Sequence, residues 1–254
     1  MWKKILCLAA AVALICPAKA QPSLTQLWDE ANNHYTSGEY GEAIGVYDSI
    51  LNEGYSSAKL YYNLGNAYFK NEQLGKAILN YYKAQRLSPA DEDIEYNLRI
   101  ANSYVKDRIE NIPEFFLTTW FRSLRNSASS NTWAVLSLVF FGATLAGAAF
   151  YLIGRGTGVR KTGFYGGIVF LILFVVSLLF SAIRRSEIRN PQEAVIMLSA
   201  APVKSSPDNN SKDIFVLHEG TKVKVGERLG DWREITVANG SKGWIEARSM
   251  EMID

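Results

Sequence analysis

The sequence predicts a multidomain chain in which an α-helical solenoid, two transmembrane helices and a small all-β barrel follow one another. Three observations predict this fold class. Residues of the same character recur about every thirty-four positions in the first half, two long uncharged runs follow, and the last part alternates between apolar and polar residues. A single globular domain does not account for all three patterns, so we expect separate modules.

The composition argues against several classes of function. The formal net charge is +2, and residues 21–57 carry six acidic side chains and no Lys or Arg. A nucleic-acid surface needs clustered basic side chains, so we expect no nucleic-acid partner. The sequence contains two histidines and no His-Glu-x-x-His, G-x-S-x-G or Walker motif. We therefore expect that the protein is not an enzyme and has no cofactor and no metal site.

The first twenty residues have the pattern of a secretory signal peptide. Lys3 and Lys4 precede an apolar run that is too short to span a membrane with confidence, and an Ala-Lys-Ala site ends at Ala20. We expect cleavage after Ala20, which makes residues 1–20 the signal peptide. Cys7 and Cys16 both lie inside this segment, so the mature chain would have no disulfide and no thiol chemistry.

Residues 58–91 carry the most specific motif in the chain. Gly65 and Ala77 lie where two antiparallel helices approach closely, and Pro89 ends the second helix because its ring clashes with continued helix. Apolar residues at helical spacing form the seam between the helices. The landmark positions are Leu64, Gly65, Tyr68, Ala77, Tyr81, Ala84 and Pro89. This pattern resembles the tetratricopeptide repeat (TPR), which is thirty-four residues long.

A weaker copy of the repeat precedes this stretch, and a single helix follows it. Counting back thirty-four positions places Ala31 over Gly65 and Tyr47 over Tyr81. Five helices are close to the minimum for an independent solenoid, because neighbouring repeats stabilise one another. The predicted TPR domain covers residues 21–113, with repeats at 24–57 and 58–91 and a capping helix at 92–112.

The resemblance implies that the first helix of each repeat lines a concave groove that binds a peptide or a protein. Asparagine amides can hydrogen-bond a peptide backbone, and lysine ammonium groups can hold a carboxylate. Asparagine is also common in the motif, so a structural or protein-docking role for this face stays open. The expected groove residues are Trp28, Asn32, Tyr35, Lys59, Tyr62, Asn63, Asn66, Lys70, Tyr96 and Asn97.

Residues 133–153 and 163–183 are predicted to be transmembrane helices 1 and 2. Neither run contains a charged residue, and each is about 30 Å long as a helix, which matches the hydrocarbon core of a bilayer. The short loop at 154–162 makes them an antiparallel hairpin, and a linker at 114–132 precedes it. The lack of ionisable residues in the spans argues against transport. Small residues that we expect to permit close packing are Gly142, Ala146, Gly147, Gly166 and Gly167.

The topology rests on two signals that disagree. A signal peptide sends the repeats across the membrane, which makes the loop with Arg155, Arg160 and Lys161 cytoplasmic. The arginines that flank the outer ends of the hairpin oppose this assignment under the positive-inside rule. We expect the signal peptide to decide. The protein would then be a multi-pass protein of the bacterial inner membrane with its N-terminal and C-terminal domains in the periplasm.

Residues 184–254 comprise a linker and a predicted β domain at 190–254. Short strands alternate with turn residues, and Asn239-Gly240 predicts a type I′ hairpin turn. The order E-G-T-x-V-x-V, D-W-x-x-I and N-G-x-x-G-W-I resembles bacterial SH3 domains. We expect Trp232 and Trp244 to pack in the core of this domain, and ligand stacking is the alternative.

The order of all these segments resembles the Bat aerotolerance family. The resemblance implies a role in oxygen-stress survival or envelope integrity. It also implies partners, namely membrane proteins with von Willebrand factor A domains and TPR proteins of the same system. The residues themselves indicate a membrane-anchored scaffold for protein–protein interaction that presents two modules on one face. The alternative is a cell-wall adaptor, in which the SH3-like domain binds peptidoglycan and the TPRs dock a wall enzyme.

Overall fold

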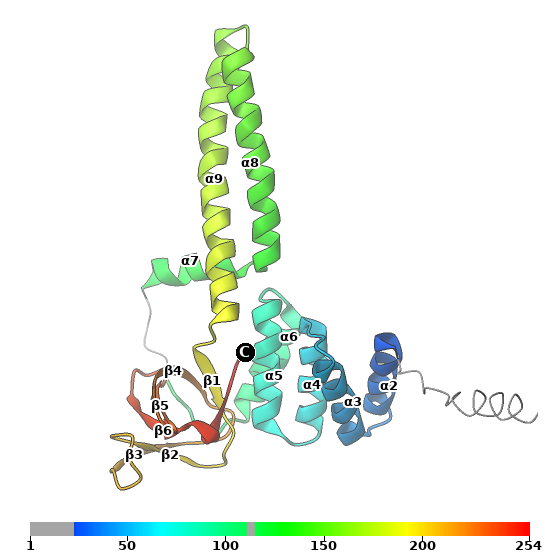
Figure 1. Cartoon of the computed structure of the whole chain (residues 1–254), viewed down its shortest axis with the longest axis vertical. Helices are drawn as coiled ribbons and strands as arrows, with labels where there is room; N and C mark the ends of the chain where they lie inside the picture. Colours follow the sequence, from blue (N-terminus) through cyan, green and yellow to red (C-terminus); the bar gives the residue numbers. More distant parts are fainter. Residues whose placement is uncertain (1–22, 111–114) are drawn as a thin grey trace, which may run out of the picture.

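The computed structural model describes residues 23–110 and 115–254, so the predicted signal peptide at 1–20 lies outside the described residues. The predicted fold class is confirmed, because helical repeats, two long apolar helices and a C-terminal antiparallel sheet follow one another. The repeats and the sheet lie together at one end of the long helical hairpin (Figure 1). Two modules that are far apart in sequence therefore share one end of the molecule.

Paired antiparallel helices form the repeat region, which we define as α2 to α6. The first helix of each unit starts at a capping residue, and the three caps, Ser23, Ser57 and Asp91, are spaced thirty-four residues apart. Each cap side chain accepts a hydrogen bond from a first-turn amide, which fixes where the helix begins. The bounds are α2 Leu24–Thr36, α3 Tyr40–Asn52, α4 Ala58–Lys70, α5 Leu74–Leu87 and α6 Glu92–Ser103.

Small residues set the distance between the helices of a pair. A Cβ atom at Gly65 would lie 2.8 Å from the ring of Tyr81, so the expected close approach at Gly65 is present. Ala31, Ala43 and Ala77 are fully buried at the corresponding contacts. Any larger side chain at these positions would separate the helices, because close-packed interiors leave no free volume.

The capping helix is shorter than predicted. Helix α6 ends at Ser103, whereas the sequence pattern suggested a helix to residue 112, of which 111 and 112 lie outside the described residues. The amides of Tyr104 and Val105 bond back to α6, and the chain then leaves the helix. Asp107 and Ile109 instead contact the C-terminal sheet. Tertiary contacts with a distant module therefore outweigh continued helix in this segment.

Two long helices, α8 (Ser130–Ile153) and α9 (Thr157–Arg189), form the hairpin. Both are long and apolar enough to cross a membrane. Helix α9 extends past the predicted span at both ends, because the polar residues that flank the span remain helical. Ser130 and Ser181 close the base of the hairpin, since each hydroxyl donates to the other residue's carbonyl oxygen, at 3.1 and 3.0 Å.

Three glycines let the hairpin helices touch. A Cβ at Gly147 would lie 2.8 Å from the Cα of Gly167, and a Cβ at Gly163 would lie 2.7 Å from the carbonyl oxygen of Gly147. The sequence predicted close packing at Gly147 and Gly167, and Gly163 was not among the predicted residues. Gly142 and Gly166 have no atom within 4 Å of such a Cβ, and Ala146 is exposed, so these three do not form the contact.

An amphipathic helix, α7 (Phe116–Asn126), lies where the sequence analysis placed only a linker. It runs across the base of the hairpin that α8 and α9 form (Figure 1). Large apolar side chains on this helix, including Phe116, Trp120 and Phe121, are exposed. A short helix with this character is typical of the interface between a membrane and water.

Seven antiparallel strands form the β module, in the order β3-β2-β6-β5-β4-β1-β7. Its buried core includes Ala194, Ile196, Val203, Ile235 and Ile245, which come from β1, β2, β5 and β6. The strands are β1 Glu193–Ile196, β2 Ala201–Lys204, β3 Asp213–Leu217, β4 Lys222–Leu229, β5 Trp232–Thr236, β6 Lys242–Glu246 and β7 Met250–Met252.

The turn between β5 and β6 differs from the predicted type I′ turn. Gly240 has φ +82°, but Asn239 does not have a positive φ, which a type I′ turn requires at both central residues. The Gly240 amide donates to the Val237 carbonyl oxygen at 2.9 Å. The geometry is that of a longer hairpin loop with a left-handed glycine.

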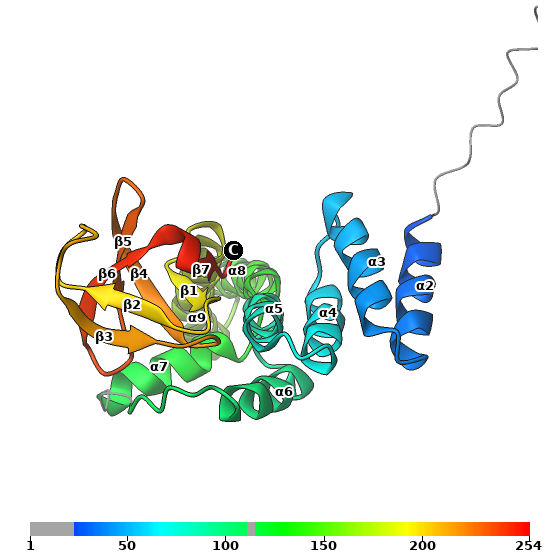
Figure 2. The same ribbon diagram turned by 90° about the horizontal axis from the view of Figure 1, so that it is seen from below.

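Helix α5 joins the repeat region to the β module (Figure 2). Val195 and Ile253 from the β module belong to the same buried cluster as the helices. The Gly75 amide donates to Glu219 Oε1 at 2.7 Å, and Lys83 Nζ lies 2.5 Å from Asp254 Oδ1. The two modules thus share apolar core as well as polar contacts, and neither is a separate body.

Candidate functional site

The predicted groove residues lie on the three first helices of the repeats, and we call their common surface the inner face. Helix α4 contributes five of them, α2 three and α6 two. The structure brings the asparagines of neighbouring helices together: Asn63 Nδ2 lies 3.1 Å from Asn32 Oδ1, and Asn97 Nδ2 lies 2.8 Å from Asn66 Oδ1. All four asparagines are half-buried.

Each pair of asparagines is completed by a tyrosine from the second helix of a repeat. The Tyr47 hydroxyl donates to Asn32 Oδ1 at 2.7 Å, and the Tyr81 hydroxyl donates to Asn66 Oδ1, also at 2.7 Å. Tyr81 and Tyr47 are thirty-four residues apart, as are the asparagines that they bond. We call each Tyr–Asn–Asn group a clasp. The two clasps tie three successive first helices together.

The clasps give the asparagines a structural role that the sequence analysis left open. Each Oδ1 acceptor in Asn32 and Asn66 already holds two donors. Their amide groups can still offer donors to a ligand, because an asparagine has two amide hydrogens in addition to its oxygen. The sequence did not predict that Tyr47 and Tyr81 act as hydrogen-bond donors, although the thirty-four-residue spacing between them was visible in it.

Aromatic and basic side chains make up the more open part of the inner face. Lys59 Nζ lies 5.4 Å from the ring centroid of Trp28, and the Arg99 guanidinium lies 5.9 Å from that of Tyr96. Tyr96 is 57% exposed. Tyr62 accepts a hydrogen bond from Asn97 at 3.0 Å, which links it to a clasp. Tyr35 stacks edge-on against Tyr40, and Lys70 is exposed in the last turn of α4.

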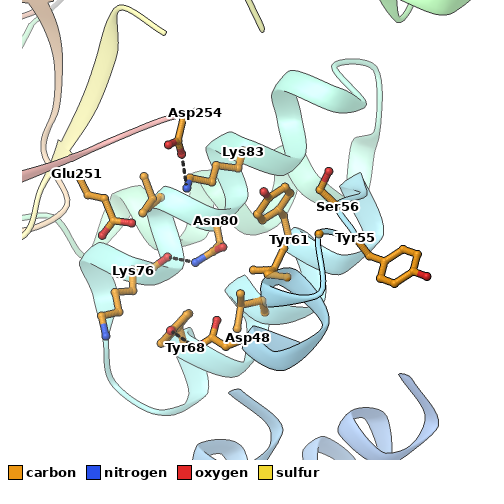
Figure 3. Close-up of a pocket in the computed structure, with 14 residues that line it drawn as sticks. Asp48, Tyr55, Ser56, Tyr61, Tyr68, Lys76, Asn80, Lys83, Glu251 and Asp254 are labelled. Atoms are coloured by element: carbon orange, nitrogen blue, oxygen red, sulfur yellow. Dashed lines mark hydrogen bonds and ion pairs between the residues drawn. The ribbon is translucent and has the colours of Figure 1, made fainter. Parts of the chain in front are cut away.

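A cavity of about 520 Å³ opens between the second helices of the repeats and the end of β7 (Figure 3). Asp48, Lys76 and Lys83 line it from the helices, and Glu251 and Asp254 line it from the β module. Burial raises the pKa of the Asp48 carboxyl, and the hydrogen bond from the Tyr68 hydroxyl, at 3.2 Å, only partly opposes this. The cavity is therefore polar and carries both signs of charge.

The ion pair in this cavity holds the end of β7 against α5. Burial alone would raise the pKa of Asp254, but the hydrogen bond and charge of Lys83 outweigh it and lower the pKa below its ordinary value. Lys83 also lies 5.8 Å from the ring centroid of Tyr61. These contacts make the cavity part of the junction between modules.

The tryptophans of the β module do not lie where the sequence analysis expected them. Trp232 and Trp244 are half-buried, and neither belongs to the buried core. Side chains alternate along a strand, so Trp244 points away from the face that buries its neighbour Ile245. Glu234 pairs with Trp244, and Trp232 pairs with Glu246, which makes the two indoles diagonal neighbours on the outer face. The core-packing expectation was wrong for both residues.

Clusters with metal-ligand character are absent from residues 23–110 and 115–254, where no group of three or more His, Cys, Asp or Glu side chains is placed to hold an ion. A contact between a carboxylate and a histidine joins Asp107 to His218. Asp107 Oδ1 lies 2.6 Å from His218 Nδ1, and Asp107 Oδ2 accepts from the His218 amide and the Thr221 hydroxyl, both at 2.6 Å. This group fastens the segment after α6 to the β module.

Comparison with known families identifies two of the modules. Residues 58–91 match the tetratricopeptide repeat, and residues 199–251 match the bacterial SH3 domain. No curated protein matches the chain significantly. Domains of these two kinds typically bind proteins, and bacterial SH3 domains also fit a role at the cell wall. The chain therefore has a binding role of one of these two types, built from modules that are typically non-catalytic.

Proposed function

We propose that the protein is a membrane-anchored scaffold for protein–protein interaction, in which the inner face of the repeats docks a partner and the hairpin holds it at the membrane. The observation that carries this proposal is the junction of α5 with the β module. Because the two binding modules share a core at one end of the hairpin, they present their surfaces in a fixed relation to each other. A flexible tether would not impose such a relation.

The exposed surface of the hairpin supports the membrane anchor. Leu138 and Leu152 are 69% and 71% exposed, and apolar side chains cover most of the outer surface of α8 and α9. A soluble protein rarely exposes a contiguous apolar surface of this extent, whereas a bilayer buries it. The aromatic face of α7 would then lie at the interface between lipid and water.

The inner face supports a partner with an acidic or extended segment. Lys59 and Lys70 place positive charge along it, and the clasps leave the amide groups of Asn32 and Asn66 available to a backbone. We propose a partner from a Bat-type envelope-stress complex, specifically a membrane protein with a von Willebrand factor A domain, on the periplasmic side of a bacterial inner membrane. The order of signal-like segment, repeats, hairpin and SH3-like domain supports this assignment.

Site-specific photocrosslinking in native membranes tests the docking surface. A photoreactive amino acid at Tyr96, on the inner face, should crosslink to a von Willebrand factor A domain protein of the same membrane. One at Tyr55, which is 50% exposed between α3 and α4, should not. The substitution Lys59→Glu should abolish the Tyr96 crosslink, while the matched change Lys242→Glu on β6 should preserve it. Equal crosslinking from Tyr96 and Tyr55 would refute the inner face as the docking surface.

The outer face of the β module favours a second candidate function, a cell-wall adaptor that binds peptidoglycan. Trp232 and Trp244 are half-buried diagonal neighbours beside Glu234 and Glu246, an arrangement that can stack on a sugar ring. The full chain in detergent should then be retained on purified sacculi, and Trp244→Ala should reduce retention more than Trp28→Ala. Equal retention of both variants would exclude this face as a wall-binding surface.

A further inference from the structure

A second cavity, of about 820 Å³, opens at the base of the hairpin, and we call it the junction cavity. The end of α5, the last turns of α7 and α9, and the neighbouring strands β1 and β4 all contribute to its wall. The repeat region, helix α7, the hairpin and the β module meet at this place (Figure 1). None of the residues that line it is a predicted inner-face residue of the repeats or one of the two tryptophans of the β module.

The wall of the junction cavity is strongly basic. Its basic residues are Arg86, Arg122, Arg125, Arg184, Lys222 and Lys224, and its acidic residues are Glu187 and Glu193, which leaves a net charge of +4. Both carboxylates already have partners. Glu187 bonds Arg125 at 2.9 Å and Arg184 at 3.2 Å, and Glu193 bonds Lys222 at 2.9 Å. The wall therefore holds more basic than acidic side chains.

The wall also contains buried polar atoms that have no hydrogen-bond partner among the described residues. Arg184 is 6% exposed, and one of its amino groups donates to the Arg86 carbonyl oxygen at 2.9 Å. Two donors, the Nε atoms of Arg184 and Arg125, and one acceptor, Asn126 Oδ1, are buried and have no hydrogen-bond partner among the described residues. Burial lowers the pKa of the Arg86 guanidinium, and the nearby Arg184 charge acts in the same direction. Grouped, desolvated cations with unused donors are costly unless an anion compensates them.

A phosphate group meets the chemical requirement of this wall. Its non-bridging oxygens accept several hydrogen bonds at once, and guanidinium groups bind them in paired geometry. The cavity volume is well above that of one phosphate ion and lies within the range of cavities that bind small organic ligands. A phosphate that carries a further organic group therefore suits the cavity better than inorganic phosphate.

The position of the cavity identifies the source of that phosphate. Arg122 and Arg125 reach the wall from α7, whose exposed Phe116 and Trp120 mark the level of the membrane interface. Arg184 comes from the turn of α9 that directly follows the apolar span. The cavity thus lies at the depth of lipid headgroups, and its opening is near the surface where they are most concentrated.

We propose that the junction cavity binds the headgroup phosphate of an anionic phospholipid, which then holds the repeat region and the β module in a defined orientation against the membrane. This inference rests on the proposed membrane anchor. It adds a lipid ligand to the scaffold and assigns a role to the arginines that flank the hairpin. Arg122, Arg125 and Arg184 are among the flanking arginines that opposed the expected topology under the positive-inside rule.

Native mass spectrometry of the full chain in detergent tests the proposal. The probes are phosphatidylglycerol, phosphatidylcholine and inorganic phosphate. Phosphatidylglycerol should remain bound at activation energies that remove phosphatidylcholine. The double variant Arg125→Gln/Lys224→Gln should bind phosphatidylglycerol about 25-fold more weakly, since each basic side chain near a lipid surface contributes roughly fivefold. The control Lys212→Gln/Lys242→Gln removes the same charge from exposed positions outside the cavity and should change binding by less than about twofold.

Three results would overturn the proposal. Equal retention of the two lipids by the unchanged chain would show that no anionic headgroup is selected. Equal weakening by the control variant would show that net charge, not the cavity, attracts the lipid. Displacement of phosphatidylglycerol by inorganic phosphate at equal concentration would make free phosphate the ligand. Extraction of the chain from membranes by alkaline carbonate would instead refute the membrane anchor. This assay therefore distinguishes failure of the proposed function from failure of the lipid site.

Discussion

Removing the Asp107 carboxylate should loosen the contact between the repeat region and the β module. Asp107 accepts three hydrogen bonds from the β module, each at 2.6 Å, and its side chain is only 12% exposed. In Asp107→Ala, the His218 amide and the Thr221 hydroxyl lose their partner in a largely buried place. At about 1 kcal/mol for each bond, the opening of this contact should become easier by about 3 kcal/mol.

Hydrogen exchange measured by mass spectrometry reports this opening directly. A change of about 3 kcal/mol corresponds to roughly 150-fold faster exchange in peptides that cover His218 to Val223, provided that these amides exchange by local opening. Glu227→Ala is the matched control, because it removes an exposed carboxylate from β4 of the same module. Peptides from α2 and α3 should not change in either variant.

A result below about threefold for Asp107→Ala would refute the reasoning. It would mean that the shared apolar core, with Val195 and Ile253, holds the two modules together without help from the polar contact. Equal acceleration in Asp107→Ala and Glu227→Ala would likewise show that the effect depends on charge rather than on the three hydrogen bonds. Circular dichroism should confirm that both variants keep the helical content of the unchanged chain.

Three further predictions follow from the packing and from the charges. Gly65→Ala places a Cβ 2.8 Å from the Tyr81 ring and should lower the free energy of unfolding of the repeat region by about 1–3 kcal/mol, measured by urea denaturation. An unchanged free energy of unfolding would mean that the helices can separate freely. The pKa of the Asp107 carboxyl in the folded protein lies below its ordinary value of 3.8, so the stability that this carboxylate contributes is present above about pH 4 and is lost as the pH falls through the folded-state pKa. Tryptophan fluorescence should therefore show an acid transition that is weaker in Asp107→Ala, and identical transitions in the two proteins would contradict this. Gly147→Leu should force α8 and α9 apart, because Gly163 and Gly167 contact Gly147. The distance between spin labels on α8 and α9 should increase by several Å, and an unchanged distance would exclude the glycine contact.

The structure also changes how the modules should be tested. Strand β1 and the end of β7 bury Val195 and Ile253 against α5, so a fragment that begins near residue 190 would expose apolar surface that the full chain covers. Experiments on the isolated SH3-like region would therefore report on a perturbed domain. The full chain in detergent or in native membranes is the appropriate material for the binding assays above.

Much of the helical architecture was predictable because its signals are local. Gly65, Ala77 and Tyr81 identify a repeat through their spacing, and caps at Ser57 and Asp91 set its phase. The ten expected inner-face residues are still candidates for binding, because their spacing places them on the first helices but does not identify a ligand. The clasps were not predicted, since hydrogen bonds between side chains of different helices depend on how the helices pack.

The sequence by itself determined the kinds of module and their order, because helical and strand periodicity and capping act over a few residues. Only the tertiary structure decided that α6 stops at Ser103, that Trp232 and Trp244 face outward, and that six basic residues meet in one cavity. Asp107 and His218 are 111 positions apart, and Arg86 and Arg184 are 98 apart. No spacing rule connects residues at such separations, so the chain must fold before their chemistry can be recognised.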